Sequence, residues 1–172
     1  MRAERAPQQS EALLALLQEA GVRFVIIGGV AAIAHGGSIA TRDLDVAAPF
    51  TAENVERLMT ALRPYHPKHV TRPDLGEIEE SIERLCNYRL LLIDTDLGRL
   101  DVLPEVAPIG PAESLTTVDL ELVPGRRFRV LSLDQLIEVK SFVARPKDRI
   151  VEMELRAIRD GRKPSRITEK AD

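Results

Sequence analysis

The chain has 172 residues, of which 44% are apolar and 30% charged, so it is expected to form one globular domain over residues 1–172 and not a disordered or fibrous protein. It contains a single cysteine, no apolar run of membrane-spanning length and no apolar signal-peptide core at its start, which predicts a cytoplasmic protein without an internal disulfide or a membrane partner. The net charge of −3 is unevenly spread along the chain. Residues 1–125 carry 11 Lys and Arg against 19 Asp and Glu, whereas residues 126–172 carry 13 Lys and Arg against 8 Asp and Glu. The basic C-terminal part could face a triphosphate or an RNA backbone, or it could form a solvated helical face.

The first predicted elements are a helix, a buried strand and a second, shorter helix. Ser10 begins an amphipathic pattern that ends near Gly21, and residues 24–27 form a continuous apolar run typical of a buried strand. Gly28 and Gly29 then break the run before a short helix over residues 30–35. Glycine tolerates positive φ and lets another group approach the backbone closely, while a helix N-terminus offers unpaired N–H groups. This corner therefore suits a phosphate.

A second strand follows and carries two aspartates. Asp43 and Asp45 flank Leu44, so both carboxylates point to one face of the strand and Leu44 points to the other. Two adjacent carboxylates repel each other unless a positive charge lies between them. Mg²⁺ is commonly held by one or two carboxylates together with substrate phosphates. The pattern thus predicts a cation beside the glycine corner.

The middle of the chain predicts a helix, a loop and a hairpin. Thr51 is suited to cap a helix that runs to residue 62, residues 65–75 read as a solvated surface loop, and residues 76–85 as an acidic helix. Strands at 88–93 and 99–103 form a hairpin that carries Asp101. Because its neighbours in sequence are apolar and face the other way, Asp101 is expected to stand alone on its side. An uncompensated buried charge is costly, which favours a functional role.

The last third predicts a second hairpin and two helices. The hairpin joins residues 118–123 and 126–131, and Ser132 with Gln135 resembles a capping box that opens a helix over 133–143. Lys140 falls beside the apolar stripe of this helix. Asp148 lies in the first turn of the next helix, where the helix dipole favours a carboxylate in any protein. That helix is expected to end at 159, before a frayed tail over 160–172. The whole is interpreted as α/β, a mixed sheet of five or six strands with helices mainly on one side and a C-terminal helical part at 132–160.

The ordered set of glycines and aspartates resembles the nucleotidyltransferase superfamily, whose fold is shared with DNA polymerase β. Gly28-Gly29, thirteen residues, and then Asp43-Leu44-Asp45 are similar to the signature of that superfamily, and Asp101 matches its third carboxylate. Residues 131–158 resemble the tail of small bacterial nucleotidyltransferases related to abortive-infection toxins. Together the similar parts cover about half of the chain.

The resemblance implies an enzyme that moves a nucleoside monophosphate from an NTP donor, such as ATP, to an acceptor hydroxyl, with pyrophosphate leaving. It implies that Asp43, Asp45 and Asp101 are catalytic and bind Mg²⁺, with Mn²⁺ as a possible substitute. The residues it implies for nucleotide binding are Gly28, Gly29, Thr41, Lys140 and Asp148. The chain departs from the family at two places, since Gly29 stands where many members have serine and Ile39 where relatives often have arginine.

The sequence leaves the acceptor open. With tRNA or a protein as acceptor, the chain resembles the toxin of a toxin–antitoxin pair, which implies an antitoxin partner; with a small hydroxylated drug, it resembles an antibiotic-modifying enzyme. There is no Trp, and only two Tyr and four Phe, to form an aromatic platform for RNA. A third alternative is a catalytically degenerate module that binds nucleotides or proteins.

Overall fold

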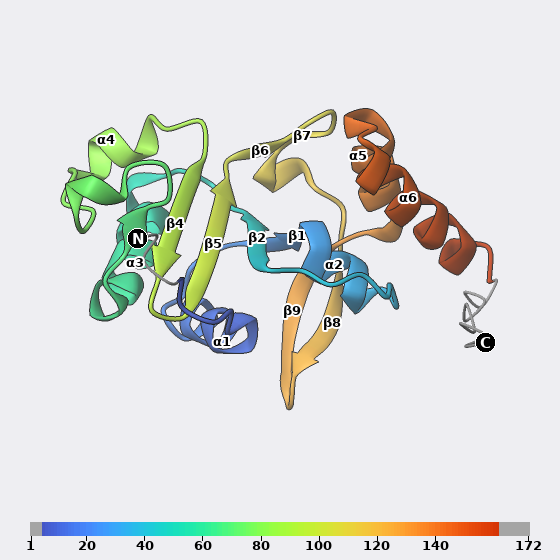
Figure 1. Ribbon diagram of the computed structural model, residues 1–172, viewed down its shortest axis with the longest axis horizontal. Helices are drawn as coiled ribbons and strands as arrows, with labels where there is room; N and C mark the ends of the chain where they lie inside the picture. Colours follow the sequence, from blue (N-terminus) through green and yellow to red (C-terminus); the bar gives the residue numbers. More distant parts are fainter. Residues whose placement is uncertain (1–4, 162–172) are drawn as a thin grey trace, which may run out of the picture.

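The computed structural model describes residues 5–161, in which a mixed seven-stranded sheet has the order β3-β4-β5-β2-β1-β9-β8 (Figure 1). The strands of this sheet are Val25–Ile27 (β1), Asp43–Ala47 (β2), Lys68–His69 (β3), Leu91–Thr95 (β4), Gly98–Leu103 (β5), Thr117–Val123 (β8) and Arg126–Leu131 (β9). Glu105–Val106 (β6) and Gly110–Pro111 (β7) form a separate two-stranded ribbon. β2 runs parallel to β5 and β1 runs parallel to β9, while the other neighbours are antiparallel.

Six α-helices accompany the sheet in the described part of the chain. They are Ser10–Glu19 (α1), Gly28–Ala34 (α2), Ala52–Leu62 (α3), Ile82–Cys86 (α4), Leu133–Val143 (α5) and Pro146–Arg159 (α6). In Figure 1, α3 and α4 lie beside β4 at one end of the molecule, and α5 and α6 form the other end. α5 packs against both α6 and α2, so the C-terminal helices contact the part of the chain that follows β1.

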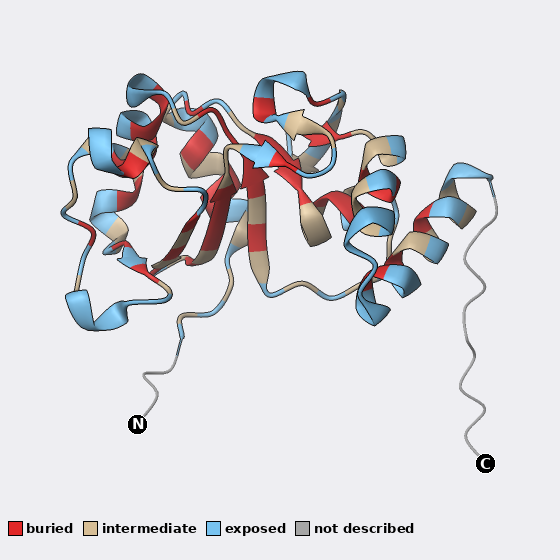
Figure 2. Cartoon of the chain, turned by 90° about the horizontal axis from the view of Figure 1, so that it is seen from above, coloured by how far each residue is buried: buried red, intermediate tan, exposed pale blue. Residues whose placement is uncertain are grey.

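The alternation of side chains in the two central strands separates the core from a polar face. Leu44 and Val46 on β2, and Leu100 and Val102 on β5, are at most 1% exposed and belong to one continuous apolar core. Figure 2 shows this core as the red stretches of the strands. The aspartates between these residues must therefore lie on the opposite face.

The mixed α/β architecture predicted from the sequence is confirmed, with one strand more than expected. The helix predicted over 133–143 has those bounds, and the following helix ends at Arg159 as expected. Thr51 caps α3 by accepting a hydrogen bond from the Asn54 N–H at 3.2 Å. The frayed tail predicted for 160–172 falls almost wholly outside the described residues.

Two local predictions are wrong for the same reason. The loop predicted over 65–75 contains the edge strand β3, and the helix predicted over 76–85 forms only at 82–86. Residues 77 and 78 are extended instead, because Glu77 pairs with Lys68 and the Ile78 N–H donates to the Pro67 carbonyl at 2.9 Å. His69 is consequently buried and not solvated, with Nε2 3.0 Å from both carboxylate oxygens of Glu80.

The capping box at α5 is only half formed. Ser132 accepts from the Gln135 N–H at 3.3 Å, as predicted. The Gln135 side chain does not reach back to Ser132, because its Oε1 accepts from the Thr116 N–H at 2.7 Å and so ties the helix to the start of β8.

Among residues 5–161, no helix is long and apolar enough to cross a membrane.

Candidate active site

The sheet brings the three predicted aspartates together on one face. In the parallel pairing of β2 with β5, Asp45 lies opposite Asp101 and Asp43 lies opposite Arg99. Residues two apart on a strand share a face, so these four side chains form a charged square above the apolar core. The convergence of Asp43, Asp45 and Asp101 expected from the sequence is therefore present.

Asp101 does not stand alone on its side, which corrects the prediction made from its apolar neighbours. Arg99 donates to both of its carboxylate oxygens, through Nε at 2.7 Å and Nη2 at 3.1 Å. The same Nε lies 4.0 Å from Asp43. Arg99 was not among the predicted site residues, although its position two residues before Asp101 on a strand places it on the same face. One guanidinium thus partly balances three carboxylates.

Asp45 is the carboxylate of this cluster that is hardest to ionise. Burial raises the pKa of Asp45 to about 6, and the charges of Asp101 and Asp43 and a hydrogen bond with Asp101 act in the same direction. The positive charge of Lys140 opposes this shift but does not cancel it. Because Asp45 ionises only at a raised pH and lies near two other carboxylates, a further cation is most favourable at this position.

The glycine corner lies directly against Asp45. Gly28 begins α2 with φ +65°, and a Cβ added there would lie 2.9 Å from the Cβ of Asp45 and overlap its carboxylate. Only glycine satisfies both the positive φ and this close approach. The first helical N–H groups of α2 are thereby held next to the carboxylates, as the phosphate-binding interpretation requires.

We predict that Gly28→Ala destabilises the protein by about 2 kcal/mol, because alanine is strained at positive φ and its methyl group displaces Asp45. Urea denaturation measures this change. Gly125→Ala is the matched control, since Gly125 also has φ +75° but a Cβ there meets no atom within 4 Å. A loss no larger than that of the control would show that Asp45 is free to move away from the glycine.

The position of the Thr41 side chain explains why residue 29 is glycine. A Cβ at Gly29 would lie 2.9 Å from both the Cβ and the Oγ1 of Thr41. The Thr41 hydroxyl donates to the Asp43 carbonyl at 3.0 Å, which fixes it at the entrance to β2. The space that a serine side chain would need at position 29 is therefore taken by the threonine, whose hydroxyl lies beside the glycine corner.

Lys140 and Asp148 form a buried ion pair between α5 and α6. The lysine Nζ lies 3.1 Å from one oxygen of Asp148, and Arg145 Nε lies 2.8 Å from the other. The Asp148 side chain is only 4% exposed. Burial alone would raise the pKa of Asp148, but the hydrogen bonds from Arg145 and Lys140 outweigh it and hold that pKa below its usual value. Asp148 thus holds Lys140 in place.

A cavity of about 390 Å³ connects Lys140 to the carboxylates. Asp45, Asp101, Lys140 and Gly28 all line it, and the remaining lining side chains are apolar. Thr41, Asp43 and Asp148 are not among its lining residues. The structure therefore groups four of the predicted residues around the cavity, with Asp148 paired to Lys140 behind it.

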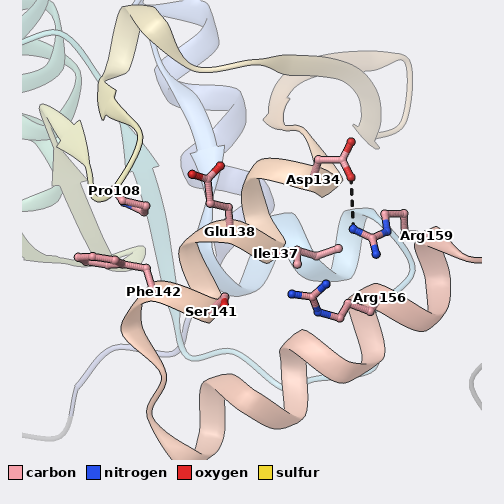
Figure 3. A pocket seen from close by; sticks show the side chains of 8 residues that line it. All are labelled: Pro108, Asp134, Ile137, Glu138, Ser141, Phe142, Arg156 and Arg159. Atoms are coloured by element: carbon pink, nitrogen blue, oxygen red, sulfur yellow. Dashed lines mark ion pairs between the residues drawn. The ribbon is translucent and has the colours of Figure 1, made fainter.

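A second hollow, between α5 and α6, has a different character (Figure 3). Both arginines that line it are already paired, since Arg159 lies 3.8 Å from Asp134 across the hollow and Arg156 lies 2.7 Å from Glu152, which is outside it. None of the residues drawn in Figure 3 is one of the clustered aspartates. We therefore place the chemistry in the cavity beside Asp45 and Asp101.

The donor set is suitable for a hard divalent cation. Carboxylate oxygens are the ligands that Mg²⁺ prefers, and such a cation would balance the charges of Asp101 and Asp43, which add to burial in raising the pKa of Asp45. Within residues 5–161, however, no group of three or more His, Cys, Asp or Glu side chains is already arranged as a metal site. Both oxygens of Asp101 are engaged by Arg99. Asp43 and Asp45 are thus the available ligands, and Asp101 could join them once Arg99 releases it.

The mixed sheet, with a glycine-led helix after β1 and carboxylates on adjacent parallel strands, defines a nucleotidyltransferase fold. Solved structures agree with this assignment. The antibiotic-resistance factor ANT(2'')-Ia, crystallised with adenylyl-2''-tobramycin, is 18% identical in sequence to this chain. The superposition covers 88% of this chain and 87% of that chain, with a TM-score of 0.56. The lincosamide antibiotic adenylyltransferase LnuA, with bound lincomycin, is 14% identical, with 90% and 99% covered at a TM-score of 0.59. No family model and no curated protein matches the sequence.

Proposed function

We propose that the protein is a nucleotidyltransferase that moves a nucleoside monophosphate from an NTP to an acceptor hydroxyl. The observation that carries this proposal is the pairing of Asp45 with Asp101 beside Gly28, on the face that Lys140 reaches from α5. A phosphate-binding corner, a cluster of carboxylates and a lysine thus surround one space. Phosphoryl chemistry needs little more than positioning and charge stabilisation, and these groups supply both.

Each residue has a separate task in this proposal. The N–H groups at Gly28 and Gly29 would bind the β and γ phosphates of the donor, and the Thr41 hydroxyl would join them by giving up its hydrogen bond to the Asp43 carbonyl. Lys140, held by Asp148, would stabilise the charge that develops on the pyrophosphate. Asp43 and Asp45 would hold Mg²⁺, which when bound supplies charge neutralisation and orientation of the phosphates.

The reaction joins the acceptor oxygen to the α-phosphorus of the donor. The bond between that phosphorus and the oxygen bridging to the β-phosphate breaks, and pyrophosphate leaves with the bonding electrons. Asp101 would take the proton of the acceptor hydroxyl as the new bond forms. For this transfer, Arg99 would have to give up at least one of its two hydrogen bonds to the carboxylate oxygens of Asp101.

The nature of the acceptor is supported less directly. ANT(2'')-Ia and LnuA are bound to small antibiotics or their adenylylated product, which favours a small hydroxylated molecule over a macromolecule. The alternative of a toxin that modifies tRNA or a protein, with an antitoxin as partner, stays a prediction. A degenerate module without turnover is the third possibility, and the following experiment separates it from an enzyme.

We expect a nucleotide to raise the melting temperature only when Mg²⁺ is present. Ligand at about 100 times its dissociation constant adds roughly 2.7 kcal/mol of stability, and each kcal/mol raises the midpoint by about 2–4 °C for a chain of this size. Melting curves with each of the four NTPs, with and without Mg²⁺, measure this effect. ATP is the first donor to test, because both solved structures involve adenylyl transfer or its product.

Asp101→Asn tests whether the bound nucleotide is turned over. It should retain most of the nucleotide-dependent shift and lose pyrophosphate release, whereas Asp119→Asn, at an exposed position on β8, should change neither. No shift with any NTP would refute the enzyme proposal. A shift without pyrophosphate release, tested with a panel of hydroxylated acceptors, would instead identify a degenerate nucleotide-binding module.

A further inference from the structure

We infer that the acceptor carries its hydroxyl on an uncharged, largely apolar body, which lies in the cavity between β4, β6 and α5. This inference rests on the proposed function and specifies the substrate class. One wall of the cavity is formed by Leu90, Leu92 and Val106, and the other by Val139, Phe142 and Val143. Asp45 on β2, Asp101 on β5 and Lys140 on α5 line the same cavity. An acceptor seated there would direct its hydroxyl to Asp101 while its body contacts only apolar side chains.

The mouth of the cavity is also apolar. Leu90 is 41% exposed, Phe142 60% and Val143 42%, although all three line the cavity. Figure 3 shows Phe142 extending from α5 toward Pro108, away from Ile137 on the same helix. Large apolar side chains that remain exposed around a concave site are typical of a ligand that covers them.

The charges in the cavity argue against a cationic acceptor. Among residues 5–161, Asp45 and Asp101 are the only acidic side chains that line it, and Arg99 and Lys140 already lie near them. A polycationic drug would need further carboxylates to replace the water that solvates each of its ammonium groups. A cavity of about 390 Å³ is of the size that holds a small molecule and is too small for an RNA helix or a folded protein.

The nucleobase of the donor is a poor occupant of the same walls. A base presents N–H and C=O groups at its edge, and a buried polar group left without a partner costs about 1–3 kcal/mol. In the described part of the chain, the only polar side chains of the lining are Asp45, Asp101 and Lys140, which the proposed function assigns to the phosphates, the cation and the acceptor hydroxyl. The apolar remainder of the cavity is therefore left for the acceptor.

Binding of 2-naphthalenemethanol tests this inference, because the probe combines an apolar body with one hydroxyl. The protein has no tryptophan, so no indole emission overlaps the fluorescence of the probe. We expect saturable binding that persists with saturating ATP and Mg²⁺, and labelling of the probe from ATP that is radioactive at its α-phosphate. Kanamycin, as a polycationic competitor, should not displace it.

Leu90→Glu should weaken binding of the probe at least tenfold, because it places a carboxylate against an apolar body. Leu75→Glu is the matched control, since Leu75 is 55% exposed and does not line this cavity. Both positions are at the surface, so both variants are expected to fold, and their melting curves check this. Phe142→Ala provides a second variant that removes contact area without adding charge.

The outcomes separate the inference from the function on which it rests. If NTPs raise the melting temperature but the probe fails to bind, is displaced by ATP, or binds equally well to Leu90→Glu, the inference is overturned and the function stands. Transfer of label to kanamycin or tRNA and not to the probe would also overturn it. If no NTP raises the melting temperature, the proposed function itself fails, whatever the probe does.

Discussion

Asp45→Asn is expected to be more stable than the parent above pH 6 in the absence of divalent cations, by up to about 3 kcal/mol, at 1.36 kcal/mol for each unit of pKa. The pKa of Asp45 rises from 3.8 to about 6 on folding, mainly through burial and the charges of Asp101 and Asp43. Asparagine has no charge to desolvate or repel. The same change should reduce transfer by about 10³-fold, which corresponds to several kcal/mol of lost stabilisation of the transition state.

The raised pKa of Asp45 determines how the stability of the parent changes with pH. Because the folded pKa of Asp45 is raised, the folded state binds more protons than the unfolded state between about pH 4 and pH 6. The stability of the parent therefore falls as the pH rises through this window, and the full cost remains above it. Below pH 3.8 the carboxyl is protonated in both states and contributes nothing.

Urea denaturation of the parent and Asp45→Asn from pH 4 to pH 8 measures this difference. The variant should lack the decline between pH 4 and pH 6, and Asp119→Asn should retain it. Added Mg²⁺ should stabilise the parent at pH 8 more than Asp45→Asn. Parallel pH profiles for the parent and Asp45→Asn would show that neither burial nor the neighbouring carboxylates raise the pKa of Asp45.

The charged cluster shows how far local patterns reach. The alternation of side chains places Asp43 and Asp45 on one face, and the hairpin places Asp101 two residues from Arg99, so the face of each carboxylate follows from the sequence. Their pairing does not, because β2 meets β5 in a parallel register that joins segments more than fifty residues apart. The resemblance to nucleotidyltransferases supplied that link, but it said nothing of Arg99.

The helical part was predicted most closely, because its signals are local. Ser132 marks the start of α5, and Pro146 the start of α6, within one turn of the residues they affect. The segment around β3 was predicted least well, since the bridge from Lys68 to Glu77 overrides the helical tendency of an acidic stretch. The cavity could not be predicted either, because it exists only where α5 lies across the sheet.

Removing Asp148 is expected to destabilise the protein by about 3–5 kcal/mol, the range for breaking a buried ion pair by deleting one partner. Asp148→Leu would leave Lys140, whose side chain is 16% exposed, without its carboxylate. Lys140→Met should cost less, because Asp148 keeps Arg145 as a partner. The double variant should recover to within about 1 kcal/mol of the parent, since an apolar pair of similar volume replaces both charges.

Activity should not follow stability in this series, and that difference reveals the role of the lysine. If Lys140 stabilises the charge that develops on pyrophosphate, both variants that lack it should have low kcat, including the stable double variant. Urea denaturation and steady-state kinetics on all four proteins make this comparison. The exposed pair of Glu152 with Arg156, at 2.7 Å on α6, is the control and should contribute no more than about 0.5 kcal/mol. A double variant with restored kcat would assign Lys140 and Asp148 a purely structural role, because catalysis would then depend on the packing of α5 against α6 and not on the charge.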